Sequence, residues 1–265
     1  MFEEEVTMVE NEISKRIQMR LNDNRLAFAK LNIPRFYIAG GALHKEEPND
    51  YDLFPVVEKD FNSHFNISQE KQSNLKAKIW ETPNAVTYKI DGITIQLCKF
   101  WKPTLAETVE RFDFTHCKIG VEVNRVRYGR DSYAFLVSHS YVSPDYIRYR
   151  MLGYSEYNPK ADCYPLSSLL RIGKYMNKGF IRSPYDVVFK ILESFLERGY
   201  KSRQDFLDQL KGIDVGIDEA QRLTENAHIL KHIYYLLTGD VIPQEEIVQK
   251  LMVEMGQIQN VVLRR

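Results

Sequence analysis

The chain has 265 residues, a formal net charge of zero, 44% hydrophobic residues and 27% charged residues. This length predicts one large domain or two modest ones, and with no run of eighteen apolar residues and no cleavable leader we expect a cytoplasmic protein without a membrane span. The three widely spaced cysteines include no Cys-x-x-Cys pair, so neither a disulfide framework nor a zinc cluster is indicated.

The first predicted elements are a helix and a strand. Apolar side chains recur every three to four positions over residues 3–31, which predicts an amphipathic helix, with a break at residues 22–24. Residues 35–39 are rich in strand formers and run into Gly40 and Gly41. This order predicts a strand that ends at a glycine turn.

A second strand is expected over residues 50–57, followed by a polar stretch at residues 58–78 that fits a helix. Residues 84–90 and 93–100 have strand character and are separated by Asp91-Gly92. This dipeptide is the strongest hairpin signal in the chain because both positions tolerate a positive φ angle.

The rest of the chain changes from mixed to helical character. We expect a short helix at residues 103–110, a strand or buried segment at 112–123 and strand-like alternation over 121–142. Helices are then expected at residues 166–178, 184–198, 202–210, 217–237 and 244–257, with Gly179, Gly199, Gly212 and Gly239 at helix ends.

These elements predict an α+β protein in three parts. Residues 1–34 form an N-terminal helical segment, and residues 35–160 form a core in which a short mixed sheet is flanked by helices. Residues 161–265 form an all-helical neck and C-terminal domain.

The arrangement with the most chemical content is the glycine turn followed by two aspartates. Residues two apart on a strand project from the same face, so the carboxylates of Asp50 and Asp52 converge. Mg²⁺ prefers oxygen ligands and takes one or two protein carboxylates together with substrate phosphates. Glycines let backbone N–H groups approach a triphosphate. A lone Asp-x-Asp or Gly-Gly is usually structural, and it is their order here that indicates a site.

Residues 36–43 (Phe-Tyr-Ile-Ala-Gly-Gly-Ala-Leu) and residues 49–53 (Asn-Asp-Tyr-Asp-Leu) resemble the signature of the DNA polymerase β superfamily of nucleotidyltransferases. Within it, the likeness is closest to the head and neck of CCA-adding enzymes and bacterial poly(A) polymerases. Residues 111–115 (Arg-Phe-Asp-Phe-Thr) are similar to the family's R-R-D-F-T segment, and residues 170–180 are similar to its neck helix. The resemblance covers roughly residues 35–182.

The resemblance implies a polymerase β-like nucleotidyltransferase core that moves a nucleoside monophosphate from an NTP, such as ATP, to a hydroxyl. The acceptor would be RNA, a protein or a small molecule, and pyrophosphate would be released. Two Mg²⁺ ions would be held by Asp50 and Asp52. Nucleotide contacts are implied at Gly40, Gly41, Arg111, Asp113, Arg171 and Lys174. A solvated helix face is the alternative for Arg171 and Lys174, and a turn or cap is the alternative for Asp113.

The sequence also departs from the family pattern. Gln96 stands where the family has its third carboxylate; its amide oxygen can bind Mg²⁺, but it adds no negative charge and cannot act as a base. His44-Lys45 replaces Arg-Asp, and Phe112 replaces the second arginine of R-R-D-F-T. The rear half has no E-D-x-x-R segment, which disfavours CCA addition itself. The alternative function is therefore a catalytically inactive scaffold that acts as a binding or structural protein.

Weaker signals concern possible partners. Residues 111–182 contain twelve Lys and Arg against six Asp and Glu, and tyrosines alternate with arginines over residues 125–157. This pattern favours phosphate or RNA contact slightly over a protein interface or a solvated surface. His228 and His232 have the spacing of a metal site but no third ligand, so we expect surface histidines.

Overall fold

The computed structural model describes most of the chain and divides it into two compact units. The N-terminal unit comprises Met1–Ile79 and Ala85–Ala161, and the C-terminal unit comprises Trp80–Asn84 and Asp162–Arg265. The described residues are 2–31, 33–44, 48, 50–57, 78–81, 85–129, 133–161, 164–198, 202–210 and 227–251. The helix expected at residues 58–78 lies outside them, apart from residue 78.

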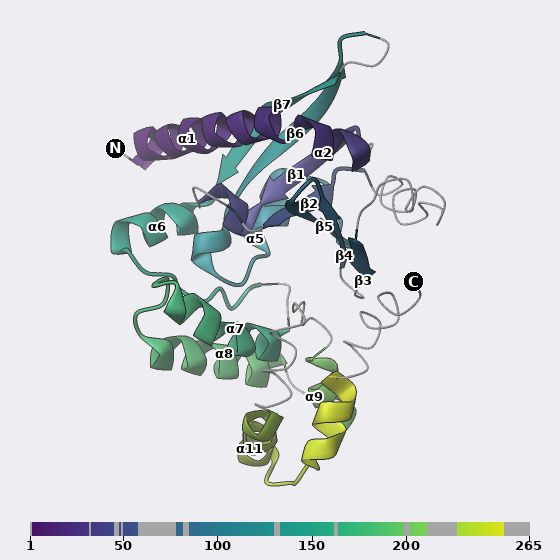
Figure 1. Ribbon diagram of the computed structural model, residues 1–265. Coiled ribbons are helices and arrows are strands. Elements are labelled where there is room, and N and C mark those ends of the chain that lie inside the picture. The colour runs from purple at the N-terminus through teal and green to yellow at the C-terminus, as the bar shows by residue number, and fades with distance from the viewer. Residues whose placement is uncertain are drawn as a thin grey trace. The chain divides into compact units, whose positions relative to one another are not determined.

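A seven-stranded sheet has the order β3-β4-β5-β2-β1-β6-β7, and all of its strands except β3, which the two units share, lie in the N-terminal unit (Figure 1). Among the described pairings, β2 and β5 are parallel and the others are antiparallel. The predicted α+β class with a mixed sheet is therefore confirmed. The strands are β1 (Arg35–Ala39), β2 (Asp50–Pro55), β3 (Lys78–Glu81), β4 (Ala85–Ile90), β5 (Ile93–Cys98), β6 (Ile119–Arg127) and β7 (Tyr133–Val142).

The hairpin predicted at Asp91-Gly92 is confirmed. It joins β4 to β5, and the two turn residues have φ angles of +50° and +87°. A positive φ at both central positions gives the turn the twist of the strands it connects.

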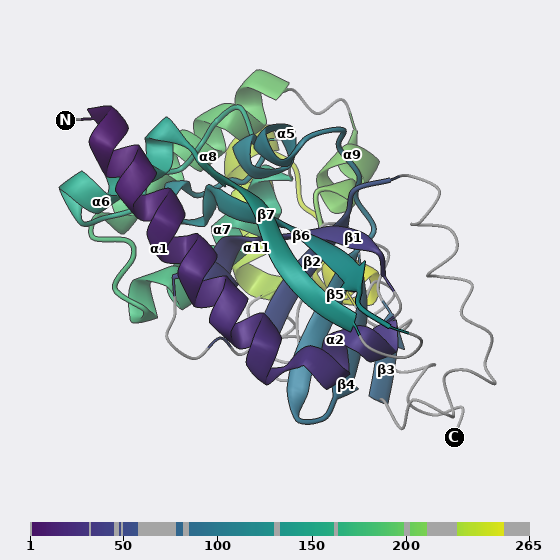
Figure 2. The ribbon, with the colours of Figure 1, turned by 90° about the horizontal axis from the view of Figure 1, so that it is seen from above.

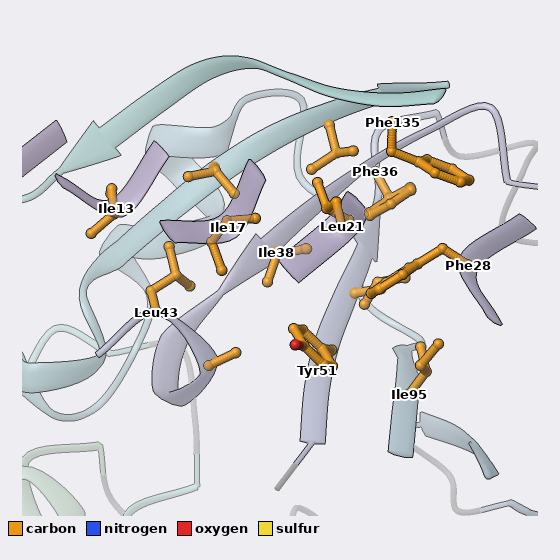
Figure 3. Close-up of a cluster of buried hydrophobic side chains, with 14 of the residues drawn as sticks. Ile13, Ile17, Leu21, Phe28, Phe36, Ile38, Leu43, Tyr51, Ile95 and Phe135 are labelled. Atoms are coloured by element: carbon orange, nitrogen blue, oxygen red, sulfur yellow. The ribbon is translucent and has the colours of Figure 1, made fainter. Parts of the chain in front are cut away.

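One face of the sheet is covered by two helices, α1 (Phe2–Asp23) and α2 (Arg25–Leu31). The predicted break is confirmed, since the helices separate at Asn24. Figure 2 shows α1 lying alongside β7. The apolar stripe of α1 meets the sheet in one buried cluster, drawn in Figure 3, that includes Ile13, Ile17, Leu21, Phe28, Phe36, Ile38, Leu43, Tyr51, Ile95 and Phe135.

Helix α1 also covers the outer edge of the sheet at β7. The side-chain amide of Gln18 donates to the carbonyl of Phe135 at 2.7 Å and accepts from the N–H of Val137 at 2.9 Å. A sheet edge exposes unpaired backbone groups that invite pairing with other chains. Gln18 satisfies two of these groups as a neighbouring strand would.

The opposite face of the sheet is covered in part by α5 (Leu105–Glu110). Thr104 and Glu107 form a capping box that starts this helix. Leu105 and Val109 pack in a second cluster that includes Tyr37, Ala39, Phe54 and Val56. Helix α5 approaches β6 so closely that a Cβ atom at Gly120 would lie 2.7 Å from Leu105 Cδ1 and 2.8 Å from Val109 Cγ2.

Two further elements of the N-terminal unit are η2 (Thr115–Cys117) and α6 (Pro144–Leu152). Ser143 caps the start of α6, and Gly153 ends it in the left-handed conformation. His116 of η2 is buried, and its Nδ1 lies 2.7 Å from the hydroxyl oxygen of Ser155.

The C-terminal unit is helical, as predicted. Its helices are α7 (Pro165–Asn177), α8 (Pro184–Arg198), α9 (Arg203–Asp208), α11 (Ala227–Thr238) and helical residues 244–251. Gly179 and Gly239 follow helices with positive φ angles, whereas Gly199, Gly212 and residues 217–226 and 252–257 of the expected helices lie outside the described residues. Its core includes Leu166, Phe195, Phe206, Leu230, Tyr234 and Ile247.

Among the residues that the structure describes, none of the helices combines the length and the hydrophobicity that a membrane span requires.

We predict that Gly120→Ala destabilises the protein by roughly 1–3 kcal/mol, because the added methyl group overpacks the contact between β6 and α5. Urea unfolding of the purified variant measures this change. Gly129→Ala is the matched control, since a Cβ at Gly129 meets nothing within 4 Å. Equal midpoints for the two variants would show that α5 moves away at no cost.

Candidate active site

Strand β2 separates its apolar and acidic side chains onto opposite faces of the sheet. Tyr51 and Leu53 enter the cluster beneath α1, whereas Asp50 is exposed and Asp52 is half-buried. Side chains alternate along a strand, so the two aspartates share the other face, as the sequence predicts. This is the face that α5 covers only in part.

The neighbouring strand β5 brings Gln96 beside the aspartates. In the parallel β2–β5 pair, Asp50 lies opposite Thr94 and Asp52 lies opposite Gln96. Ile95 and Leu97 enter the cluster beneath α1, so Gln96 points to the same face as Asp52. Adjacent strands are about 4.8 Å apart, which is close enough for both side chains to reach one cation.

The next strand, β4, extends this polar surface. Thr87 lies opposite Gln96, and Lys89 lies opposite Thr94. On this face, one row of residues therefore runs from Asp52 through Gln96 to Thr87, across β2, β5 and β4. A second row runs from Asp50 through Thr94 to Lys89. Thr87, Lys89 and Thr94 are not predicted from the sequence, because the hairpin signal does not indicate which of its two strands pairs with β2.

The glycine turn follows β1 directly. Residues Gly40–Leu43 form a single 3₁₀ turn, η1. Gly40 has a φ angle of +79°, a conformation that L-amino acids rarely adopt, which explains glycine at this position. A Cβ atom at either Gly40 or Gly41 would meet nothing within 4 Å. Both Cβ positions are therefore free of contacts with the described residues.

Arg111 lies at the end of α5 and stacks on an aromatic ring. Its guanidinium carbon is 2.9 Å from the ring centroid of Phe100, and the Nζ of Lys102 is 5.7 Å from the same centroid. Phe100 in turn packs edge-on against Phe54, which shares its sheet face with Asp52. This stack connects the predicted arginine to the face that carries the aspartates. Phe100 and Lys102 were not predicted from the sequence.

An ion cluster around one buried lysine fixes the end of α5 that carries Arg111. The Nζ of Lys118, whose side chain is 2% exposed, lies 3.0 Å from Glu110 Oε2 and 2.5 Å from Asp145 Oδ2. The hydroxyl of Tyr141 donates to Glu110 Oε1 at 2.8 Å. Burial, together with this hydrogen bond to Glu110, raises the pKa of Tyr141 above its usual value, so the phenol remains a donor.

Asp113 lies in the turn after α5 and is only 3% exposed. Its carbonyl accepts a 2.7 Å hydrogen bond from the N–H of Asn158. The Asn158 side chain donates to the carbonyls of Glu110 at 3.2 Å and Phe112 at 3.1 Å. This burial agrees with the turn alternative for Asp113.

The remaining predicted residues, Arg171 and Lys174, lie on α7 in the C-terminal unit. Arg171 donates from Nε to the carbonyl of Ser167 at 3.4 Å, and Lys174 is exposed. The N-terminal unit by itself therefore brings together Asp50, Asp52 and Gln96.

The chemistry of the donor set fits Mg²⁺. Two carboxylates and one amide oxygen are hard ligands, and Mg²⁺ usually takes only one or two protein carboxylates. No group of three or more His, Cys, Asp or Glu side chains suited to a metal occurs in the described part of the chain. His228 and His232 lie on α11 and are both exposed, in agreement with the prediction of surface histidines.

Comparisons with known proteins give two kinds of likeness. A family model described as Gabija anti-defense 2 family protein matches residues 8–139. A CCA-adding enzyme solved in complex with CTP is 15% identical, with a TM-score of 0.42, over 92% of this chain and 67% of that chain. The Thermotoga maritima CCA-adding enzyme complexed with tRNA is 12% identical, with a TM-score of 0.39, over 96% of this chain and 84% of that chain. No curated protein matches.

We predict that Asn158→Ala destabilises the protein by about 1–3 kcal/mol, because it leaves the partly buried carbonyls of Glu110 and Phe112 without this donor. Denaturant unfolding gives the change in free energy. Lys160→Ala, which removes an exposed side chain from the same loop, is the control and should be nearly neutral. A loss no larger than that of the control would contradict the assigned role of Asn158.

Proposed function

We propose that the protein is a Mg²⁺-dependent nucleotidyltransferase that moves a nucleoside monophosphate from an NTP to a hydroxyl acceptor. The observation that carries the proposal is the placement of Asp50, Asp52 and Gln96 on one face of two parallel strands. The open space at the Gly40–Gly41 turn supports it. In the reaction, the acceptor oxygen bonds to the α-phosphorus, the bond to pyrophosphate breaks, and the hydroxyl proton is released.

Residues of the N-terminal unit have separate roles in this proposal. Asp50, Asp52 and Gln96 hold Mg²⁺, which supplies charge neutralisation of the phosphates and a lower pKa for the attacking hydroxyl. Backbone N–H groups of Gly40 and Gly41 approach the β- and γ-phosphates. Arg111 adds positive charge for the triphosphate, held in one orientation by Phe100.

Further contacts are proposed outside this set. Asp113 would lie near the sugar, and the nucleotide contacts of Arg171 and Lys174 stay predictions from the sequence. We propose a cytoplasmic protein whose acceptor is RNA, a protein or a small molecule. The name of the matching family suggests that the activity is directed against Gabija defence.

The alternative function is a nucleotidyltransferase-like scaffold that binds a partner and does not catalyse. Gln96 favours this alternative, because the residue opposite Asp52 is an uncharged amide and adds no negative charge for a metal ion. The anti-defence name is compatible with it as well, since inhibition of a defence protein needs only binding.

We predict that the purified protein with Mg²⁺ transfers label from α-phosphate-labelled ATP, CTP, GTP or UTP, or releases pyrophosphate from them. Total RNA and the protein itself serve as first acceptors. Asp50→Asn plus Asp52→Asn should lower the rate at least about 100-fold, because it removes both negative ligands. Activity that is indifferent to the double substitution would remove the catalytic assignment, and wild-type protein without activity would favour the scaffold.

Gln96→Glu tests the third ligand directly. We predict that the Mg²⁺ concentration for half-maximal activity falls, on the order of tenfold, because the new carboxylate lies beside Asp52 and attracts the cation. Lys15→Gln, which changes the net charge by the same amount on the exposed side of α1, should leave the Mg²⁺ dependence unchanged. An equal or higher Mg²⁺ concentration for half-maximal activity in Gln96→Glu would place Gln96 away from the metal.

A further inference from the structure

Two arginines of α1 reach the glycine turn from the far side of the sheet. Arg16 and Arg20 are four residues apart, so they lie on the same side of the helix. Arg20 is 9% exposed and is surrounded in the sequence by residues of the apolar stripe, including Ile17 and Leu21. Burial of a charged group is costly unless hydrogen bonds compensate for it, so this position calls for a specific role.

The two side chains bind consecutive carbonyl groups of η1. Arg20 Nη1 donates to the carbonyl oxygen of Ala42 at 2.6 Å, in a buried position. Arg16 Nη1 donates to the carbonyl oxygen of Leu43 at 2.8 Å. The last carbonyls of a helical turn have no partner inside the turn, and cationic side chains satisfy them. The arginines therefore hold the turn that begins at Gly40.

The turn that Arg20 binds packs against β2 as well as β1 and β6. On β2, Tyr51 separates Asp50 from Asp52 in the sequence and points into the core on the side of α1. The backbone segment that Arg20 holds therefore lies beside the strand that carries the proposed metal ligands.

Both arginines are themselves held in place. Arg16 Nη2 lies 2.5 Å from Glu12 Oε1, and Glu12 Oε2 also pairs with Arg150 of α6 at 3.1 Å. The side chain of Asn24, at the break between α1 and α2, donates to the carbonyl of Arg20 at 3.0 Å. The Glu12 contact limits the side-chain freedom that Arg16 loses when it binds η1, and the Asn24 contact holds the backbone of α1 at Arg20.

We propose that Arg20, assisted by Arg16, is a positioning residue that fixes the Gly40–Gly41 turn relative to Asp50 and Asp52. The inference rests on the proposed function for its catalytic consequence. A displacement of about 1 Å between reacting groups can lower a rate by about 100-fold, so a clamp on the turn matters for transfer. The arginines do not touch the nucleotide; they act through the backbone of η1.

The test compares Arg20→Met, Arg20→Lys and Arg16→Met with Arg25→Met, an exposed control on α2. Hydrogen exchange of a peptide spanning residues 40–44 is the first measurement, and thermal unfolding confirms that each variant folds. We expect at least about tenfold faster exchange in Arg20→Met, a smaller increase in Arg16→Met, partial recovery in Arg20→Lys and no change in the control.

The second measurement is steady-state transfer with the NTP that the wild type uses best. Arg20→Met should raise the KM for that NTP about tenfold or more and lower kcat, with partial rescue by Arg20→Lys. If Arg20→Met does not fold, the same ranking is read from Arg16→Met and Arg20→Lys. Wild-type exchange and wild-type KM in a folded Arg20→Met protein overturn the inference.

The two measurements also separate this inference from the proposed function. A wild-type protein that neither binds nor transfers any Mg²⁺-NTP contradicts the proposed function. Faster exchange at residues 40–44 in Arg20→Met then still supports the positioning role of Arg20, and unchanged exchange still overturns that role. Failure of the clamp alone leaves the wild-type activity in place.

Discussion

The alternation of side chains along β2 is the constraint on which the proposed site depends. Tyr51 and Leu53 are drawn into the core beneath α1, and this burial forces Asp50 and Asp52 onto the opposite face. A shift of the strand by one residue would bury both carboxylates and expose both apolar side chains. The same hydrophobic burial that stabilises the sheet therefore also sets the direction of the two acidic groups.

The two faces of the sheet are covered unequally. Helices α1 and α2 cover one face, whereas α5 packs over β1 and β6 and is held close by Gly120. The rows through Asp50 and Asp52 continue onto β5 and β4 with threonine, glutamine and lysine in place of apolar residues. Asp50 and Lys89 are exposed, whereas Thr87 is buried, so the row through Asp50 is the one that meets water.

Local signals predicted the backbone of the site, and non-local contacts could not be predicted. The strand, the glycine turn, the Asp-x-Asp strand and the Asp91-Gly92 hairpin each depend on neighbouring residues, and all were found from the sequence. Lys118, the Phe100–Arg111 stack and the contact of Arg20 with Ala42 join distant segments. In the sequence, Arg20 has the appearance of an ordinary charged residue on an amphipathic helix. Periodicity identifies the apolar stripe but does not say which polar residue at its margin is buried.

Gln96 separates two properties that a third carboxylate would have combined, namely binding of a nucleotide and activation of its acceptor. A Mg²⁺-NTP complex carries its own cation, so two aspartates with an amide oxygen are sufficient ligands for it. Activation of the attacking hydroxyl depends more strongly on negative charge in the site, because that charge favours binding of a second cation. An amide in place of a carboxylate adds no such charge and cannot accept the proton of the hydroxyl. Under the proposed function, Gln96 is therefore expected to lower the rate of transfer more than the affinity for a Mg²⁺-NTP, and a slow enzyme and a nucleotide-binding inhibitor would share the same site.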